Sequence, residues 1–286
     1  MNDALYYSRA QEDAVSCALC PNHCIIHEGR AGLCGVRRNN GGKLYAAGYG
    51  LVSSIALDPV EKKPLRQFHP GKRVLSIGGF GCNLRCPFCQ NYEISREYRA
   101  RWEDAEPFSA DQIAALAIKS LPGGNIGVAY TYNEPLVGYE FTCDCARRVR
   151  AAGLKNILVT NGYVEEEPLL AILPYMDAMN IDLKGFTDGF YHKLGGSLQP
   201  VKDTIQAAGR FCHVEITTLI IPGENDSENE IMALAGWLGS IGADMPLHLT
   251  RFFPRYQYAD RRPAPRETVN RLGDAARRYL KNVYVC

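Results

Sequence analysis

Three cysteines, Cys82, Cys86 and Cys89, lie within nine residues of one another in the stretch GCNLRCPFC at residues 81–89. Their C-x3-C-x2-C spacing lets three thiolates surround one side of a compact soft-metal centre, because iron–sulfur clusters select cysteine ligands. A [4Fe–4S] cluster held by three thiolates keeps one iron free for another ligand, as a catalytic cluster requires. The alternatives are a structural zinc site with a distant fourth ligand, or chance clustering.

Four further cysteines, Cys17, Cys20, Cys24 and Cys34, follow a C-x2-C-x3-C-x9-C pattern near the amino terminus. Such a set suits a closed tetrahedral zinc site, which stabilises a segment too small to have its own core. A second, electron-relaying [4Fe–4S] cluster is the rival, because its ligands are equally soft. We favour zinc, since the polar loops around these cysteines resemble a structural site. A zinc-ribbon module for nucleic acid is disfavoured, because few aromatic residues accompany the basic ones.

The other four of the eleven cysteines show no motif spacing: Cys143, Cys145, Cys212 and Cys286. The first three fall in helix-like or strand-like stretches, where a free cysteine usually packs as a small hydrophobe. We assign no role to Cys286.

Apolar, β-branched runs alternate with helix-like segments along the rest of the chain. The runs occupy residues 74–77, 126–130, 156–160, 178–183, 213–221 and 246–250, with a shorter one at 283–285. Capping-box patterns at Ser109 and Ser227 mark the starts of two helices. This alternation predicts a parallel sheet that is buried on both faces, either a barrel or a doubly wound sheet.

Polar residues that could do chemistry lie at the ends of these runs or directly after them. In order along the chain they are the cysteine triplet, Asn133 with Glu134, Asn161, Asp182 with Lys184, and His248 with Arg251. The carboxyl ends of parallel strands carry the functional groups of α/β proteins, so we expect these side chains to share one site.

The triplet, with Phe88 just before its third cysteine, resembles the signature of the radical S-adenosylmethionine (SAM) superfamily. The surrounding sequence is similar to the activating-enzyme branch typified by pyruvate formate-lyase activating enzyme, and most closely to the radical SAM member of AmmeMemoRadiSam systems. The similarity covers nearly the whole chain, at residues 17–37, 53–64, 130–135, 160–163, 180–184 and 250–256. One departure is that many members carry a further cysteine-containing tail beyond the position of Cys286.

The resemblance implies a partial (β/α)6 TIM-type barrel at residues 51–286, preceded by a small Cys-rich metal-binding extension at residues 1–50. It also implies that the cluster binds the amino and carboxylate groups of SAM through its free iron. A donor such as flavodoxin or ferredoxin would supply one electron. Cleavage of SAM would then give a 5′-deoxyadenosyl radical, which abstracts hydrogen from a substrate.

Two substrates agree with the resemblance, and a third interpretation belongs to another class. The AmmeMemoRadiSam similarity implies action with, or on, a partner protein. The activating-enzyme similarity implies formation of a glycyl radical on a partner enzyme. The third interpretation is a non-catalytic zinc-binding adaptor that kept its cysteines for folding; the polar residues at the strand ends argue against it.

The resemblance also suggests cofactor contacts. Glu134 occupies the acidic position of a Gly-Gly-Glu-Pro-like motif and is the candidate partner of the SAM ammonium, with Asn133 in place of a glycine. The alternative for Glu134 is a charge at a helix N-terminus. Asn161 could bind the ribose or the SAM carboxylate, or could be a left-handed turn residue before Gly162.

Asp182 and Lys184 alternate with apolar residues and therefore share one face of a strand. We interpret them as cofactor or substrate contacts, with a structural ion pair as the alternative. His248 and Arg251 are candidate substrate-side groups, although a lone histidine is more often structural. Lys184, His248 and Arg251 are the catalytic candidates.

Composition excludes several classes of protein. The 286 residues carry 32 Lys and Arg against 31 Asp and Glu, so bulk charge cannot drive binding to nucleic acid. An apolar share of 46% excludes a disordered chain. No apolar run is long enough to span a membrane and no signal peptide is visible, so we expect a cytoplasmic protein without a membrane partner.

Overall fold

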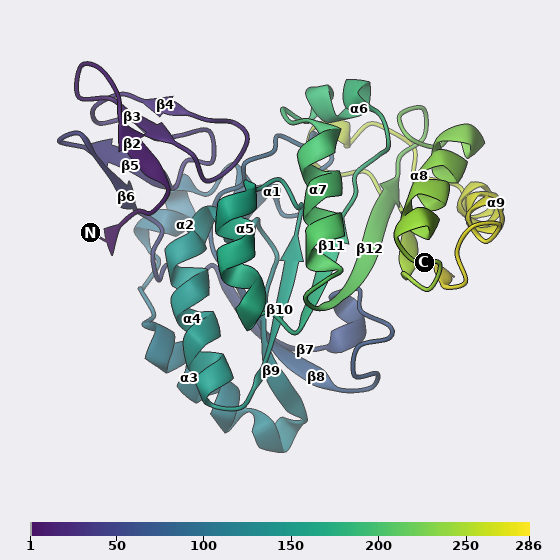
Figure 1. Cartoon of the computed structure of the whole chain (residues 1–286), viewed down its shortest axis with the longest axis horizontal. Helices are drawn as coiled ribbons and strands as arrows, with labels where there is room; N and C mark the ends of the chain where they lie inside the picture. The colour runs from purple at the N-terminus through teal and green to yellow at the C-terminus, as the bar shows by residue number, and fades with distance from the viewer. Residues whose placement is uncertain (1) are drawn as a thin grey trace.

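Within residues 2–286, which the computed structural model describes except for the side chains at positions 99 and 100, eight strands form the main sheet (Figure 1). They lie in sequence order as β7 (Ser54–Pro59), β8 (Arg73–Gly78), β9 (Asn125–Tyr130), β10 (Lys155–Thr160), β11 (Ala178–Asp182), β12 (His213–Ile220), β13 (Leu247–Arg251) and β14 (Val283–Val285). All neighbours are parallel except β7 and β8. The predicted parallel sheet is confirmed, and β7 is an additional strand.

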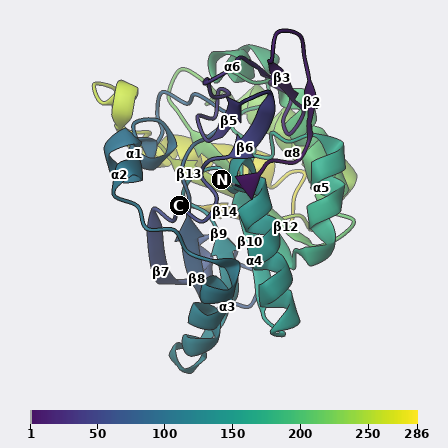
Figure 2. The same cartoon turned by 90° about the vertical axis from the view of Figure 1, so that its left-hand side faces the viewer.

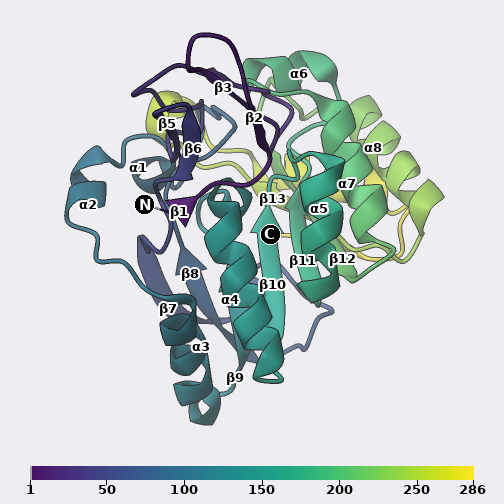
Figure 3. The ribbon, with the colours of Figure 1, turned by 60° about the vertical axis from the view of Figure 1, so that its left-hand side comes forward.

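Helices connect the parallel strands. The longer ones are α3 (Ala110–Lys119), α4 (Tyr139–Ala151), α5 (Glu166–Ile172), α7 (Leu198–Ala208), α8 (Glu228–Ile241) and α9 (Arg266–Ala276). Short helices are α1 (Tyr92–Ser95), α2 (Arg99–Glu103) and α6 (Asp188–Lys193), with 3-10 turns η1 (Val60–Lys62), η2 (Leu121–Gly123), η3 (Pro135–Gly138), η4 (Leu173–Tyr175) and η5 (Tyr256–Tyr258). Figure 3 shows α4, α5 and α7 on the same face of the sheet.

The two predicted helix starts differ in detail. Ser109 forms a complete capping box with Gln112 at the start of α3. Ser227 accepts a hydrogen bond from the Glu230 amide at the start of α8, but the Glu230 carboxylate accepts from the Phe186 amide at 2.6 Å instead of completing the box. Glu230 therefore joins α8 to the loop after β11.

The order of the strands decides between the two sheet types left open by the sequence. Each parallel strand pairs with its neighbour in sequence, from β8 to β14, and the order never reverses. A doubly wound sheet requires a reversal. The doubly wound alternative is therefore wrong, and the chain winds in one direction as in a barrel wall.

The segment between β7 and β8, residues 60–72, crosses the inner face of the sheet; we call it the strap. Asn180 on β11 donates a hydrogen bond to the Pro64 carbonyl at 2.9 Å. The amides of Arg66 and Gln67 donate to the Glu215 carboxylate on β12 at 2.9 and 2.8 Å. Because the strap covers the inner face and helices cover the outer one, the central strands are buried on both sides, as predicted.

Residues 2–46 form an amino-terminal lobe of two small antiparallel sheets. One contains β1 (Asn2–Asp3), β6 (Lys43–Ala46) and β5 (Arg37–Asn40), and the other β2 (Tyr7–Arg9), β3 (Val15–Cys17) and β4 (Ile25–Ile26). Figures 1 and 2 show the lobe, in purple, above α4.

Hydrogen bonds join the lobe to the rest of the chain. Arg37 pairs with Glu140 on α4 at 2.9 Å, and both side chains are buried. Asn22 donates to the Asn83 carbonyl beside the cysteine triplet at 2.9 Å. The lobe therefore lies beside the loops that follow the strands.

No helix within residues 2–286 combines the length and the apolar character needed to cross a membrane.

Candidate functional site

A cavity of about 400 Å³ lies where the parallel strands end. Residues that follow β8, β9, β10 and β11, together with residues within β12 and β13, contribute to its lining, which is possible because the sheet curves around it. Nine of the predicted site residues line it: Cys82, Cys86, Cys89, Asn133, Glu134, Asn161, Asp182, Lys184 and Arg251.

Local contacts fix the loop that carries the cysteine triplet. Gly81 has a φ of +83°, and a Cβ there would lie 2.5 Å from the Cys34 carbonyl oxygen, so only glycine fits. Asn83 donates to the Tyr163 carbonyl at 2.6 Å, and the Arg85 amide donates to the Leu194 carbonyl at 2.7 Å. Contacts with the loops after β10 and β11 therefore set the position of the thiols.

The donor set around this cavity fits a cluster with one open iron. Within the described chain, no histidine and no fourth cysteine lines the cavity with Cys82, Cys86 and Cys89. Residues 2–286 also contain no group of three His, Cys, Asp or Glu side chains placed around a single metal ion. A structural zinc ion at the triplet therefore lacks support, whereas a cluster spreads its irons and needs no single point of convergence.

Burial raises the pKa of Cys82 and of Cys86 and so opposes their ionisation in the metal-free protein. It raises the pKa of Cys86 to about 12, although the nearby Lys184 ammonium acts in the opposite direction. Metal ligation deprotonates cysteines and so removes this cost. Buried thiols beside a cation are suited to ligation.

Asn133 organises the approach to the triplet. Its Oδ1 accepts from the Gly79 amide at 2.9 Å, and its Nδ2 donates to the Gly81 carbonyl at 3.0 Å. An asparagine in place of glycine thus fixes the backbone that leads into the cysteine loop.

The Glu134 carboxylate is surrounded by donors from the chain itself. Oε1 accepts from Thr160 Oγ1 at 2.8 Å and from the Leu136 amide at 3.0 Å, and Oε2 accepts from the Asn161 amide at 2.8 Å. Burial raises its pKa to about 7, although these hydrogen bonds oppose the rise. Glu134 lines the cavity and also caps η3, as the alternative interpretation expected. Its contact with the SAM ammonium stays a prediction.

Asn161 lies against the triplet. Its Nδ2 is 3.6 Å from Cys82 Sγ and donates to Asn83 Oδ1 at 2.9 Å, while its Oδ1 accepts from the Tyr163 amide at 2.9 Å. The left-handed conformation belongs to Gly162, with φ +68°. The Asn161 side chain is therefore held toward the cluster ligands.

Asp182 and Lys184 share one face, as predicted, and form an ion pair of 2.6 Å at the cavity wall. Burial of Lys184 acts to lower its pKa, but Asp182 and the Cys86 thiol outweigh burial, so the pKa is raised. Lys184 is thus a fixed cation beside the cysteines.

The last two predicted residues, Arg251 and His248, differ in their relation to the cavity. Arg251 lines the cavity, but His248 is 1% exposed and its Nε2 lies 2.6 Å from the Glu215 carboxylate, deeper in the sheet. His248 is level with Thr217 on β12, and its ring is bonded to the buried Glu215. Its substrate-side role stays a prediction.

Sequence reasoning missed a polar group on the strap side of the cavity. Asp58 Oδ2 accepts from Lys63 Nζ at 2.8 Å and from the Tyr132 hydroxyl at 2.7 Å, and Lys63 Nζ lies 4.7 Å from the centre of the Tyr132 ring. Lys63 and Tyr132 line the cavity. The apolar run of Ile55, Ala56 and Leu57 could have revealed β7.

The four amino-terminal cysteines also come together. Cys17, Cys20, Cys24 and Cys34 line one small cavity of about 20 Å³ in the lobe. Their side chains are nevertheless not arranged around a single ion in the described residues, so zinc is not supported here. Their proximity agrees with the predicted cluster of ligands, and the identity of any metal stays a prediction.

A parallel α/β sheet with three cysteines in the loop after its first parallel strand defines a class of cluster-binding enzymes. The sequence pattern of the Radical SAM superfamily matches residues 76–235, more than half of the chain. This chain belongs to the radical SAM superfamily and is an enzyme similar to the activating enzymes. Membership implies a [4Fe–4S] cluster and SAM as cofactors.

Individual relatives agree with this assignment. An uncharacterized protein of Methanocaldococcus jannaschii is 41% identical over 290 residues, covering 100% of this chain and 85% of the relative. The pyruvate formate-lyase-activating enzyme of Clostridium pasteurianum is 26% identical over 174 residues, covering 56% of this chain and 67% of the relative. A radical SAM methyltransferase structure from Sphaerobacter thermophilus has a TM-score of 0.56 at 17% identity, covering 77% and 67%, and supports the fold alone.

Proposed function

We propose that this enzyme binds a [4Fe–4S] cluster through Cys82, Cys86 and Cys89 and abstracts hydrogen from a substrate with, or on, a partner protein. The observation that supports it is one cavity lined by these three thiols and by polar groups from every neighbouring strand. When bound, the cluster and SAM supply the one-electron chemistry that removes the hydrogen atom.

The chain's own residues have separate tasks in this proposal. Asn161 and Lys184 would orient SAM and offset the charge of the thiolates, since both lie beside the cysteines. Glu134 would fix the loop after β9 to the end of β10, because its carboxylate accepts hydrogen bonds from three donors there. Lys63 and Pro64 on the strap close the inner side of the cavity and would exclude water.

The functions of relatives support a protein partner. Pyruvate formate-lyase and benzylsuccinate synthase are the enzymes that two of them activate, and those two are 26% and 27% identical to this chain. Formation of a glycyl radical on a partner enzyme is the second candidate for that reason. A small electron-transfer protein such as flavodoxin or ferredoxin would supply the electron.

The remaining architecture is proposed as a partial (β/α)6 barrel from residue 51, with residues 1–50 as a metal-binding extension. The strand order of β8 to β13 supports the barrel, and the end of β6 at Ala46 before β7 begins at Ser54 supports the boundary. The four amino-terminal cysteines are proposed as ligands of zinc or of a second cluster, because all four line one small cavity.

Anaerobic reconstitution tests the function. The parent protein should bind iron and sulfide and form 5′-deoxyadenosine from SAM once a reductant is added. Cys82→Ala should lose both properties, while Cys212→Ala, which changes a cysteine outside the cavity, should keep them. Formation of 5′-deoxyadenosine by Cys82→Ala would refute the proposal.

A further inference from the structure

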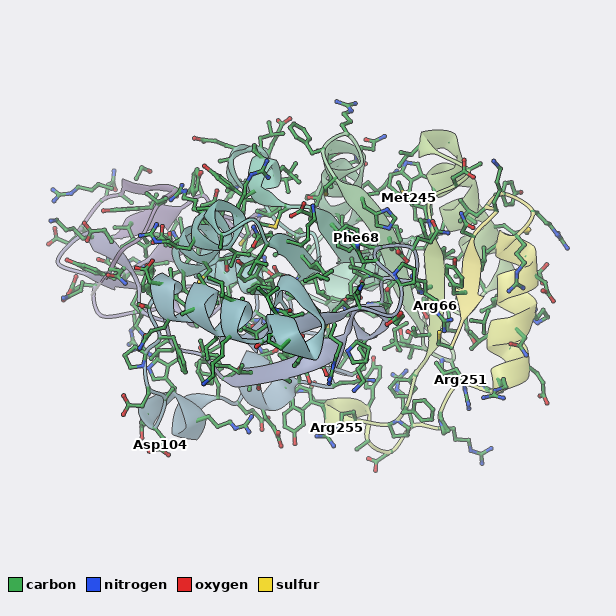
Figure 4. The ribbon with its side chains drawn as sticks, turned by 90° about the horizontal axis from the view of Figure 1, so that it is seen from below. Arg66, Phe68, Asp104, Met245, Arg251 and Arg255 are labelled. Carbon is green, nitrogen blue, oxygen red and sulfur yellow. The ribbon has the colours of Figure 1, made fainter. Side chains whose placement is uncertain are left out.

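The four cysteines of the lobe line a cavity of their own, which shares no lining residue with the cavity of the triplet. Figure 4 shows the lobe, in faint purple, and α9, in yellow, at opposite ends of the molecule, with Arg251 of the triplet cavity on the side of α9. The lobe cavity measures about 20 Å³, which is too small for an organic ligand. Within the described chain, Arg37 is the one charged side chain among its lining residues.

Arg37 is 1% exposed, and one of its three side-chain nitrogens lacks a partner. Nη1 donates to Glu140 Oε1 at 2.9 Å and to Oε2 at 3.1 Å, and Nη2 donates to the Leu5 carbonyl. Nε has no hydrogen-bond partner in the part of the chain that the structure describes. Buried donors are normally satisfied, so this N–H group calls for an acceptor that the polypeptide does not supply.

The unpartnered nitrogen lies on the side of the cysteines. Neither Glu140 nor Leu5 lines the lobe cavity, so the two Nη atoms are directed away from it and Nε is left on the cavity side. Burial acts to lower the pKa of Arg37, but Glu140 and the thiols of Cys17 and Cys34 outweigh burial and raise the pKa, which places these thiols close to the guanidinium. The acceptor that Nε lacks is therefore to be sought among the cysteine sulfurs.

Backbone amides of the lobe are already directed at its sulfurs. The Leu33 amide donates to Cys24 Sγ at 3.4 Å. The amides of Val36 and Arg37 hydrogen-bond the sulfur of Cys34. N–H groups directed at sulfur favour the thiolate over the thiol, and such outer partners are typical of sulfurs that bind a metal. The lobe therefore supplies donors that suit charged ligands.

We propose that Arg37 positions a metal centre held by the four lobe cysteines, with its Nε donating a hydrogen bond to the sulfur of Cys17 or Cys34. Four thiolates carry more negative charge than a zinc ion or an oxidised [4Fe–4S] core neutralises, so the centre is an anion that a buried guanidinium stabilises. The inference holds for either metal. It rests on the proposed role of the four cysteines as ligands, and it does not depend on the chemistry at the triplet.

Release of the metal can test this role without turnover. The parent for the test is the full chain with Cys82→Ala/Cys86→Ala/Cys89→Ala, in which the triplet cannot bind metal. It is loaded anaerobically with zinc in one preparation and with iron and sulfide in another, and each preparation that fills the lobe is kept. Excess EDTA is then added, and the metal that stays with the protein is measured over time by elemental analysis after desalting.

The variant Arg37→Lys keeps a cation beside Glu140 but removes Nε. We expect it to release the metal at least about tenfold faster than the parent, because outer partners of metal ligands contribute about 10–100-fold to metal affinity. Arg38→Lys is the matched control, since Arg38 is the next residue of β5, is exposed and does not line the cavity. Its release should be unchanged, and a parental rate for Arg37→Lys would overturn the role of Arg37.

Glu140→Gln separates a direct role of Arg37 from a merely structural one. If Nε bonds a ligand sulfur, loss of the Glu140 charge makes the surroundings of the centre more positive, so release should be unchanged or slower. If Arg37 only ties the lobe to α4, Glu140→Gln and Arg37→Lys should release the metal equally fast. That result would overturn the proposal.

A double variant keeps the test decisive if Arg37→Lys does not fold. Arg37→Met/Glu140→Leu removes both buried charges together, so neither is left unpaired. It should also release the metal at least about tenfold faster, and release at the parental rate would overturn the inference. A parent that binds neither zinc nor iron at the lobe would refute the ligand role of the cysteines and the inference with it. The expected release rates, in a protein whose unmodified chain never cleaves SAM, would refute the proposed radical chemistry alone.

Discussion

Tyr132 adopts a left-handed backbone conformation, with φ 73°, at the edge of the cavity. This conformation costs a bulky residue of order 1–3 kcal/mol, and a glycine would avoid it. The side chain compensates through its hydrogen bond to Asp58 and the Lys63 ammonium near its ring. The position therefore keeps a tyrosine because its contacts hold β7, the strap and the loop after β9 together.

We predict that Tyr132→Phe lowers the free energy of unfolding by about 1–2 kcal/mol, because the backbone strain stays while the bond to Asp58 is lost. Denaturant unfolding of the anaerobic protein measures this. Tyr45→Phe is the control, since Tyr45 is half-buried on β6 and no hydrogen bond of its hydroxyl is found within residues 2–286. Equal losses for both variants would contradict the account.

Local sequence patterns were sufficient to predict the cavity-lining residues that belong to a motif or to a strand end. The spacing of the triplet and the strand ends predicted nine residues that line one cavity. The strand β7 could have been predicted from its apolar run, but the roles of Asp58 and Lys63 could not. Those roles depend on contacts with Tyr132, which is 74 residues from Asp58 in the chain. The sequence likewise could not show that the His248 ring is bonded to Glu215, which lies 33 residues earlier in the chain.

At the scale of elements, the strap depends on one buried carboxylate. Glu215 is 0% exposed and accepts from the Arg66 and Gln67 amides, while ring nitrogens of His213 and His248 lie 2.9 and 2.6 Å from it. Burial acts to raise its pKa, but these four partners outweigh burial and lower the pKa to about 2. Ionised Glu215 therefore holds the strap against β12 and β13.

We predict that Glu215→Gln lowers the free energy of unfolding by about 3 kcal/mol at pH 7. A folded pKa of about 2, below the ordinary 4.5, means that the stabilisation is present above pH 4.5 and disappears as the pH falls toward 2. The difference between parent and variant, measured by denaturant unfolding at several pH values, should shrink over that window.

The surface variant Glu228→Gln is the control for this series. Glu228 is 35% exposed and pairs with Arg271 at 3.2 Å, so its loss should cost less than about 0.5 kcal/mol. A pH-independent difference between the parent and Glu215→Gln would show that the carboxylate charge does not hold the strap.

The strands could be predicted from their apolar runs, but the direction of the connections between them could not. The apolar runs predicted β8 to β14, because burial on both faces gives continuous apolar stretches. The choice between a singly and a doubly wound sheet had to come from the structure, because the direction of each crossover is a tertiary property. The strap escaped prediction because the backbone amides of Arg66 and Gln67 donate to Glu215, about 150 residues away in sequence, and almost any residue can supply a backbone amide.

At the scale of the whole molecule, the amino-terminal lobe lies beside the cavity rather than apart from it. Arg37 is 1% exposed and bonds both oxygens of Glu140, and the Leu5 amide bonds the same carboxylate. Asn22 of the lobe bonds the Asn83 carbonyl, and Asn83 in turn bonds Asn161 next to Cys82. A short chain of hydrogen bonds therefore links the lobe to the cysteine triplet.

The sequence left two roles open for the lobe cysteines, and the position of the lobe beside the triplet makes these roles distinguishable by experiment. A structural metal would stabilise the lobe without contributing to electron transfer, whereas a second cluster would carry electrons toward the triplet. We predict that the double variant Cys17→Ser/Cys20→Ser loses the lobe metal and melts at a lower temperature, yet keeps the iron of the triplet. Elemental analysis measures the metal content, and thermal unfolding measures the melting temperature. The control is Cys143→Ser/Cys145→Ser, which changes two buried, free cysteines outside the lobe.

Loss of zinc with SAM cleavage intact would establish a structural lobe, and loss of iron with slower reduction of the triplet would establish a relay. Unchanged metal content in the double variant would show that the four cysteines are neighbours without being ligands.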